Sequence, residues 1–590
     1  MPPIASFPRA FGVSLSLLAA PLVIPPFAAL AQDVERPQPE AATGIAAVER
    51  VTAREEMVVA AHPLAARAGA DILAAGGSAV DAMIATQLVL NLVEPQSSGI
   101  GGGAFLIHRD GETGRMIAYD GRETAPAAAD PALFLDDNGE PLGFMDAVIG
   151  GRSVGTPGLV RLLAHAHEQH GQLPWADLFA PAIALAEEGF EVGERLAALV
   201  ADNETLQRHE PTREYFFPGG AAISAGDLLR NEPFAQTLRM IADQGPDAFY
   251  RGALAEEIVE TVQGFSDNPG LLSEEDLREY VVVEREPVCA FFRVYRVCGM
   301  GPPSSGALTI GQILGLLEHF DLENLDPIGP HASHLFAEAS KLAYADRGLY
   351  MADSDFVRVP EKGLLDATYL TARAQLIDRA QAAEDVSAGN PPWRDAMLLA
   401  PDESTEVPAT SHISIVDASG NIVSMTTTIE SGFGARLMVG GFLLNNELTD
   451  FSFRPEVDGL PVANRVEPGK RPRSSMAPTI VLDAQDQPVL VVGSPGGARI
   501  IPYVARTILG VLVWDMDVQE AVDMPHVTNL NGPTDVEAGT AAADLASALE
   551  ESGHSVRVLD LNSGIHAIAF TPEGLAAGVD RRREGAAFGR

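Results

Sequence analysis

The spacing of apolar residues along the chain predicts helices first and strands later. Small apolar residues over positions 58–93, interrupted at Gly76 and Gly77, predict two closely packed helices. A strand pair is expected over 104–108 and 116–120. From about residue 156 to 350 the pattern is mostly helical, with a strand insert at 289–300.

Past residue 410 the pattern changes to strands. They are expected over 413–416, 422–429, 442–445, 479–482 and 489–492, before helix-like stretches that begin at Tyr503. The first two strands are separated by five residues, Asp417 to Asn421. If these five form a symmetric hairpin loop, Thr410 lies opposite Thr428.

The N-terminal residues 1–31 have the features of a secretory signal. Arg9 precedes an apolar run over 10–24, and an Ala-x-Ala cleavage pattern ends at Ala31. A retained membrane anchor is the alternative, but the run contains proline and is short for a bilayer. We therefore exclude this segment from the fold and predict a periplasmic or secreted protein.

Composition narrows the class of protein. The 590 residues exceed one minimal core, so one large or two intimately packed domains are expected. The formal net charge of −41 argues against a nucleic-acid partner, because neutralising phosphates requires Lys and Arg.

The two cysteines, Cys289 and Cys298, would face each other across a hairpin that turns at Arg293 and Val294. They could form a disulfide or remain two buried thiols. They lack the neighbours of a zinc site, and no metal is predicted.

The glycine run over 99–103 superficially resembles a phosphate-binding loop. It precedes a strand instead of opening a helix, so the context that a dinucleotide site requires is missing. The run instead allows two backbone segments to approach closely.

Thr410 is the candidate for chemistry. It follows a polar, proline-punctuated segment over 365–409, which is typical of an accessible processing site. If the chain is cut before Thr410, the new α-amine titrates near 7.7–8.0 and can serve as the base for the hydroxyl of the same residue. Taken alone, a threonine at the head of a strand is an ordinary β-residue.

Several separated motifs together resemble γ-glutamyltransferases, which are N-terminal-nucleophile hydrolases. The motifs are Gly99–Gly103, Gly121–Pro126, Pro302–Gly306, Ala343–Arg347, Thr410–His412, Leu444–Glu447, Lys470–Met476 and Gly493–Arg499. The resemblance implies an α+β fold with a four-layer αββα sandwich, and cleavage into a large subunit (32–409) and a small subunit (410–590). It also implies γ-glutamyl transfer through an acyl-enzyme, without a cofactor.

The resemblance also assigns catalytic roles. Thr410 would be the nucleophile and its α-amine the base, and Thr428 would hydrogen-bond to Thr410. The backbone N–H groups of Gly496 and Gly497 would bind the oxyanion, since donors already aimed at developing charge stabilise it.

Substrate recognition is expected to follow the charges of a glutamyl group. Arg122 suits a bidentate grip on the α-carboxylate. The other residues expected to bind the substrate are Ser474 and Ser475 at the carboxylate, and Glu447 and Asp450 at the α-ammonium. Expected donors are glutathione or another γ-glutamyl compound, and expected acceptors are water, an amino acid or a peptide.

The chain departs from the family at Glu430, where asparagine is usual. A third carboxylate beside Glu447 and Asp450 would tighten ammonium binding or raise the pKa of a neighbouring carboxyl. The connection from Asp450 to Ser474 is short and has no tyrosine, which predicts an open site that favours hydrolysis. The alternatives are an acylase for glutaryl-type amides, and an exported binding protein without catalysis.

Overall fold

A computed structural model describes residues 48, 50–394, 397–402, 404, 406–407 and 409–590. The predicted signal segment over 1–31 lies outside these residues. Contacts divide the chain into Met1–Pro37 and Gln38–Arg590. The second unit contains every element described below.

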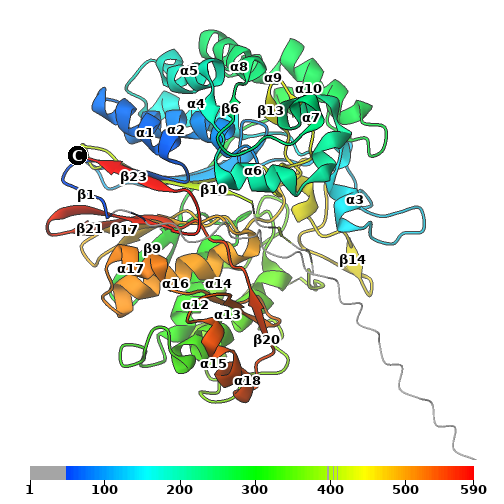
Figure 1. Cartoon of the computed structure of the whole chain (residues 1–590). Helices are drawn as coiled ribbons and strands as arrows, with labels where there is room; N and C mark the ends of the chain where they lie inside the picture. The colour runs from blue at the N-terminus through cyan, green and yellow to red at the C-terminus, as the bar shows by residue number, and fades with distance from the viewer. Residues whose placement is uncertain (1–47, 49, 395–396, 403, 405, 408) are drawn as a thin grey trace, which may run out of the picture. The chain divides into compact units, whose positions relative to one another are not determined.

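Two seven-stranded sheets form the middle of this unit (Figure 1). The first sheet has the order β1 (Thr52–Ala53), β22 (Gly574–Val579), β21 (His566–Thr571), β17 (Pro488–Gly493), β16 (Thr479–Leu482), β9 (Tyr295–Gly299), β8 (Val288–Phe292). The second has the order β23 (Ala586–Gly589), β2 (Met57–Ala60), β10 (Ser411–Val416), β11 (Ile422–Thr428), β3 (Gly103–Arg109), β4 (Met116–Gly121), β7 (Val283–Arg285).

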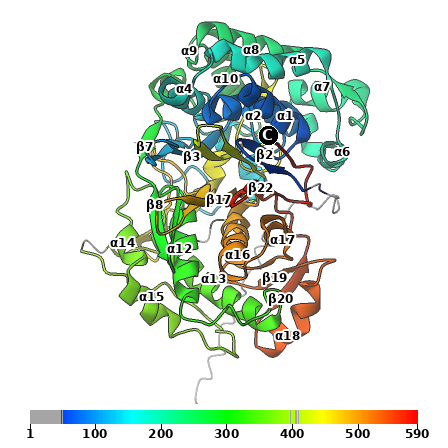
Figure 2. The same ribbon diagram turned by 90° about the vertical axis from the view of Figure 1, so that its left-hand side faces the viewer.

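Helices cover the outer face of each sheet, as Figures 1 and 2 show from two directions. One layer includes α1 (Pro63–Ala74), α2 (Ala79–Val93), α4 (Leu159–His170), α5 (Ala180–Glu188) and α8 (Glu232–Gln244). The other includes α12 (Gly306–Leu317), α13 (Pro330–Tyr350), α16 (Ile500–Val513) and α17 (Val518–Asp523). This is the expected αββα sandwich.

The β10–β11 hairpin has the register predicted from its loop. Ser411 pairs with Thr427, and the loop spans the five residues between Val416 and Ile422. Ile413 and Ile415 belong to the core shared with α1 and α2. Because side chains alternate along a strand, the residues between them face the other sheet. The hydroxyl of Ser414, for example, donates to the carbonyl of His566 at 3.0 Å.

The strand and helix predictions hold with three exceptions. Residues 58–60 belong to β2 instead of a helix, and the strand expected over 442–445 is only β13 (Phe442–Leu443). The region after Tyr503 contains further strands, β18 (Val527–Asn529), β19 (Thr534–Glu537), β20 (Val556–Leu559), β21, β22 and β23, beside its helices.

The cysteine hairpin forms as predicted. Cys289 pairs with Cys298, Phe292 pairs with Tyr295, and Arg293 in the turn has a φ of +54°. The two sulfurs are joined in a disulfide. Across the described residues, no helix is both long and apolar enough to cross a bilayer.

Candidate active site

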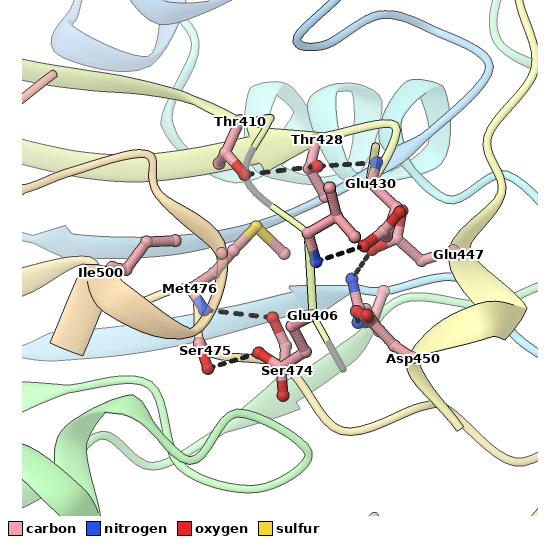
Figure 3. Close-up of a pocket in the computed structure, with 13 residues that line it drawn as sticks. Glu406, Thr410, Thr428, Glu430, Glu447, Asp450, Ser474, Ser475, Met476 and Ile500 are labelled. Atoms are coloured by element: carbon pink, nitrogen blue, oxygen red, sulfur yellow. Dashed lines mark hydrogen bonds and ion pairs between the residues drawn. The ribbon is translucent and has the colours of Figure 1, made fainter. Parts of the chain in front are cut away.

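Thr410 lies immediately before β10, and its hydroxyl meets the peptide bond expected to be cut. Its Oγ1 donates to the carbonyl oxygen of Ala409 at 2.6 Å. Thr428, at the end of β11, donates to the same oxygen at 2.9 Å, and the two hydroxyl oxygens are 3.5 Å apart (Figure 3). The side chains are brought together by the hairpin register. Two hydroxyls therefore meet at the carbonyl of Ala409.

Backbone contacts fix the hydroxyl of Thr428. The N–H of Glu430 donates to its Oγ1 at 2.8 Å, so the proton of Thr428 is left to point at Ala409. Glu430 reaches this position with a φ of +77°, which is uncommon for a residue other than glycine, asparagine or aspartate. On the other side, a Cβ at Gly102 would lie 2.1 Å from the carbonyl oxygen of Thr428. This explains one glycine of the 99–103 run.

The loop of Gly496 and Gly497 leads into α16 beside the same pocket. Both residues have positive φ values, +138° and +56°. A Cβ at Gly496 would also lie 2.8 Å from the ring of Tyr503. Gly497 lines the pocket together with Thr410 and Thr428. The position is suitable for the predicted oxyanion donors.

Arg122 is completely buried, and its guanidinium contacts protein groups. One terminal nitrogen pairs with Glu447, and the other pairs with Asp450 at 2.5 Å and donates to the carbonyl of Arg473 at 2.9 Å. Nε donates to the carbonyl of Pro472 at 3.2 Å. Four of the five guanidinium N–H donors are thus committed. The bidentate grip on substrate predicted for Arg122 is not available in the uncleaved chain.

Several buried carboxyl groups lie around the single positive charge of Arg122. Burial raises the pKa of Glu447, although Arg122 opposes the shift. Burial and then repulsion from Glu430 raise the pKa of Asp450 well above its usual range. For Glu430, burial and the charge of Glu447 raise the pKa to about 8. An ammonium group of a ligand would relieve this repulsion.

Glu406 fills the other end of the pocket, and the sequence patterns did not predict it. Its side chain is 4% exposed and forms ion pairs with Arg347 and Arg473. Ser475 donates its hydroxyl to Oε2 of Glu406, as Figure 3 shows. Burial alone would raise the pKa of Glu406, but the two arginines outweigh it and lower the pKa to about 2. The sequence did mark its two partners, because Arg347 and Arg473 both belong to motifs shared with the family.

Ser474 lines the pocket beside Ser475 and accepts the N–H of Met476 at 3.1 Å. The pocket contains all of the predicted site residues except Gly496. Its free volume is about 20 Å³, room for roughly one water molecule. Thr410 itself is only 4% exposed. The open site predicted from the short 450–474 connection is therefore not present before cleavage.

The sandwich and a threonine hydroxyl at its own peptide bond define an N-terminal-nucleophile hydrolase in its uncleaved form. A family model described as gamma-glutamyltranspeptidase matches residues 65–590. The chain belongs to this family.

Similar proteins include both hydrolases and acylases. The glutathione hydrolase proenzyme of Bacillus subtilis (strain 168) is 40% identical over 549 residues, 91% of this chain and 92% of the relative. The acylase ACY 1 proenzyme of Pseudomonas sp. (strain SE83) is 36% identical over 89% of this chain and 91% of the relative. The crystal structure of cephalosporin acylase from Bacillus halodurans has a TM-score of 0.81 at 29% identity, covering 94% of this chain and 99% of that one.

Proposed function

We propose that this chain is the precursor of an enzyme that cleaves itself before Thr410 and then cleaves γ-glutamyl amides such as glutathione. The observation that carries the proposal is the pair of hydroxyls at the Ala409 carbonyl. Attack by Thr410 Oγ1 on the Ala409 carbonyl carbon would break the peptide bond and leave an ester. The nitrogen released in this step is the free α-amine of Thr410, which takes up the proton of the hydroxyl. Water would then hydrolyse the ester, which releases the carboxyl group of Ala409 and restores the hydroxyl of Thr410.

In turnover, the α-amine accepts the proton of the Thr410 hydroxyl as it attacks the γ-glutamyl carbonyl. Backbone N–H groups of Gly496 and Gly497 stabilise the oxyanion, and Thr428 positions the nucleophile. The leaving amine departs with a proton, and water or an amino-acid or peptide acceptor opens the acyl-enzyme. We propose hydrolysis as the preferred outcome because the 450–474 connection is short.

Binding roles follow from the two ends of the pocket. Glu447, Asp450 and Glu430 are suited to the α-ammonium, because their carboxyl groups lie together in the pocket and a bound ammonium would favour their ionised forms. Ser474 and Ser475 belong at the carboxylate end. Arg122 orients Glu447 and Asp450, and one free N–H leaves it at most a single bond to the substrate.

Cleavage is tested on a denaturing gel. The wild-type protein is expected to give pieces of residues 32–409 and 410–590, with sequencing starting at Gln32 and Thr410. Thr410→Ala removes the attacking oxygen and should leave one inactive band, whereas Thr410→Ser keeps a hydroxyl and should still cleave. Cleavage that persists in Thr410→Ala would mean that another agent cuts the chain. A large piece starting at Met1 would contradict the proposed export signal.

A glutaryl-amide acylase is the second candidate, favoured by the similarity to the acylase ACY 1 proenzyme. Glutaryl and γ-glutamyl groups differ only in the α-ammonium, so the acidic cluster decides between them. We expect γ-glutamyl-p-nitroanilide to be turned over faster than glutaryl-p-nitroanilide. Turnover of the glutaryl compound alone would establish the acylase instead.

A further inference from the structure

The head of β10 is paired along one edge only. β11 pairs with it from Ser411 onward, whereas the pairing with β2 on the other side starts at Ile413. Within the described residues, the first turn of the strand thus lacks the second row of ladder bonds that its middle has. Cleavage before Thr410 would also make this head a chain terminus. Termini fray unless other contacts hold them, so the side-chain contacts of this head become important.

A buried carboxylate at the end of α2 holds the second residue of this head. The hydroxyl of Ser411 donates to Oε2 of Glu94 at 2.9 Å. Glu94 directly follows α2 and is 1% exposed, and Ser411 is completely buried. A hydrogen bond to an ionised carboxylate is roughly twice as strong as one between neutral groups. The contact also joins the two expected pieces, because Glu94 precedes the proposed cut and Ser411 follows it.

Arg195 supplies the opposite charge for Glu94. It belongs to α6 (Glu194–Ala201), and its Nε lies 3.7 Å from Oε1 of Glu94. Both side chains are buried. A buried carboxylate beside a guanidinium is less costly than an isolated one, so this pair can keep a charged acceptor beneath β10. Neither residue lines the pocket that contains Thr410, so the pair is suited to hold the protein chain and not a substrate.

The contacts at the head of β10 leave the reacting groups of Thr410 free. Arg583 donates from Nη1 to the backbone carbonyl of Thr410 at 3.1 Å. Glu94 holds the side chain of the residue that follows. The proposed mechanism uses the α-amine and the hydroxyl of Thr410, and neither group takes part in these two contacts. They can therefore fix the position of the terminus without blocking its chemistry.

We propose that Glu94 is a positioning residue, which through Ser411 holds Thr410 in line once cleavage has made it the chain terminus. This inference rests on the proposed function. Before cleavage, Thr410 is held by peptide bonds on both sides, and its hydroxyl already contacts Ala409. After cleavage, a nucleophile displaced by about 1 Å can lose on the order of 10²-fold in rate. The contact should therefore matter more for turnover than for self-cleavage.

Comparing the two reactions in one variant tests the proposal. Ser411→Ala removes the hydroxyl that donates to Glu94. We expect kcat for γ-glutamyl-p-nitroanilide, per mole of cleaved protein, to fall about 10–100-fold, with KM and the rate of self-cleavage each within about 3-fold of wild type. Gels follow the cleavage, and released p-nitroaniline follows the turnover. Equal losses in the two reactions would overturn the proposal, because the contact would then serve the strand as a whole.

A double-variant cycle connects the effect to Glu94. Glu94→Gln keeps the shape of the side chain but leaves a neutral acceptor, and should lower kcat by about 3–10-fold. In Ser411→Ala/Glu94→Gln the fall should be no larger than in Ser411→Ala alone, because the hydroxyl on which the charge acts is already absent. Effects that multiply would refute the proposal. If circular dichroism shows that Ser411→Ala is unfolded, Glu94→Gln decides, since it must slow turnover and spare cleavage.

Ser414 provides the matched control on the same strand. It is completely buried, and its hydroxyl donates to the carbonyl of His566 at 3.0 Å. At this position β10 is paired with both β2 and β11. Ser414→Ala removes a buried hydroxyl away from the terminus and should keep kcat within about 3-fold of wild type. A fall as large as that of Ser411→Ala would assign the effect to β10 in general and overturn the role of Glu94.

The outcomes separate the two proposals. A wild-type chain that neither cleaves nor hydrolyses γ-glutamyl amides would refute the proposed function itself. A wild-type chain that does both, beside a Ser411→Ala variant with normal turnover, would refute the positioning role and leave the proposed function standing.

Discussion

Thr428 donates to the carbonyl of Ala409, which would become negatively charged in the proposed self-cleavage. Its hydroxyl oxygen accepts the backbone N–H of Glu430, and its proton is donated to the carbonyl of Ala409. The hydroxyl group therefore has one defined orientation. Removing one donor from an oxyanion typically costs a factor of about 10²–10³ in rate. Thr428→Val keeps the shape of the side chain and should slow cleavage by about that factor, as followed by the disappearance of the precursor band on gels.

Thr427 provides the matched control for this prediction. It is the neighbouring buried threonine on β11, and its hydroxyl has no hydrogen-bond partner among the described residues. Thr427→Val should therefore cleave at nearly the wild-type rate. Equal slowing in both variants would point to a general effect on the strand and contradict the role given to Thr428.

Glu430 gives the precursor a specific dependence on pH. Burial and Glu447 raise its pKa from 4.5 to about 8, so between these values the folded chain holds a proton that the unfolded chain has lost. Stability should then fall as pH rises through this window, by up to about 1.4 kcal/mol per pH unit. In the Thr410→Ala background, Glu430→Gln should flatten that slope in denaturant titrations at pH 5, 6, 7 and 8.

The exposed Glu456 on β14 (Glu456–Val457) is the control. In the same background, Glu456→Gln removes a carboxyl of the same kind from the surface and should retain the slope of the Thr410→Ala chain. If the Thr410→Ala chain loses stability in parallel with and without Glu430→Gln, the proton is not held at Glu430.

At the scale of elements, one loop aspartate connects the catalytic hairpin to a helix. Asp417 accepts from the N–H groups of Ser419 and Asn421 within the loop, and from the N–H of Ala79 at the start of α2, each at 2.9 Å. Asp417→Ala leaves these donors unsatisfied and should lower the free energy of unfolding by about 2–4 kcal/mol. Denaturant unfolding of the Thr410→Ala chain measures this loss.

Asp483 isolates the contribution of the helix. It occupies the same position in the β16–β17 hairpin and accepts from the N–H groups of Gln485 and Gln487, but the loop is exposed. Asp483→Ala should cost about 1 kcal/mol or less. Equal losses in the two variants would mean that the contact with α2 adds nothing.

Local pattern is sufficient for much of the fold. The loop length between two alternating strands predicts which residues pair, and this alone places Thr428 opposite Thr410. Residues 58–60 form a strand where the pattern predicts a helix, because a strand buried on both faces has the same continuous apolar run as a buried helix.

The charged parts of the site are harder to predict. Glu406 meets Arg347 and Arg473 at sequence separations of 59 and 67 residues. No periodicity connects residues so far apart. The sequence placed Glu430 beside Glu447 and Asp450, but the pairing of Arg122 with Glu447 and Asp450 is apparent only from the fold. The motifs identify the arginines as notable without indicating their partners.

At the scale of the whole molecule, the proposed cleavage site divides the sequence but not the sheets. β10 and β11 come after the cut, yet they lie between β2 and β3, which come before it. In the other sheet β16 pairs with β9, and β1 pairs with β22. Separating the two pieces would expose the edges of central strands and both apolar faces of the hairpin.

We therefore expect the pieces to remain together after cleavage. Cleaved wild type and the intact Thr410→Ala chain should elute at the same volume in native size-exclusion chromatography, and both pieces should unfold in one denaturant transition. The denaturing gel of the eluted peak verifies that cleavage has occurred. Elution of residues 32–409 apart from 410–590 without denaturant would contradict this prediction, because the β2–β10 and β3–β11 pairs would then have to break in the native protein.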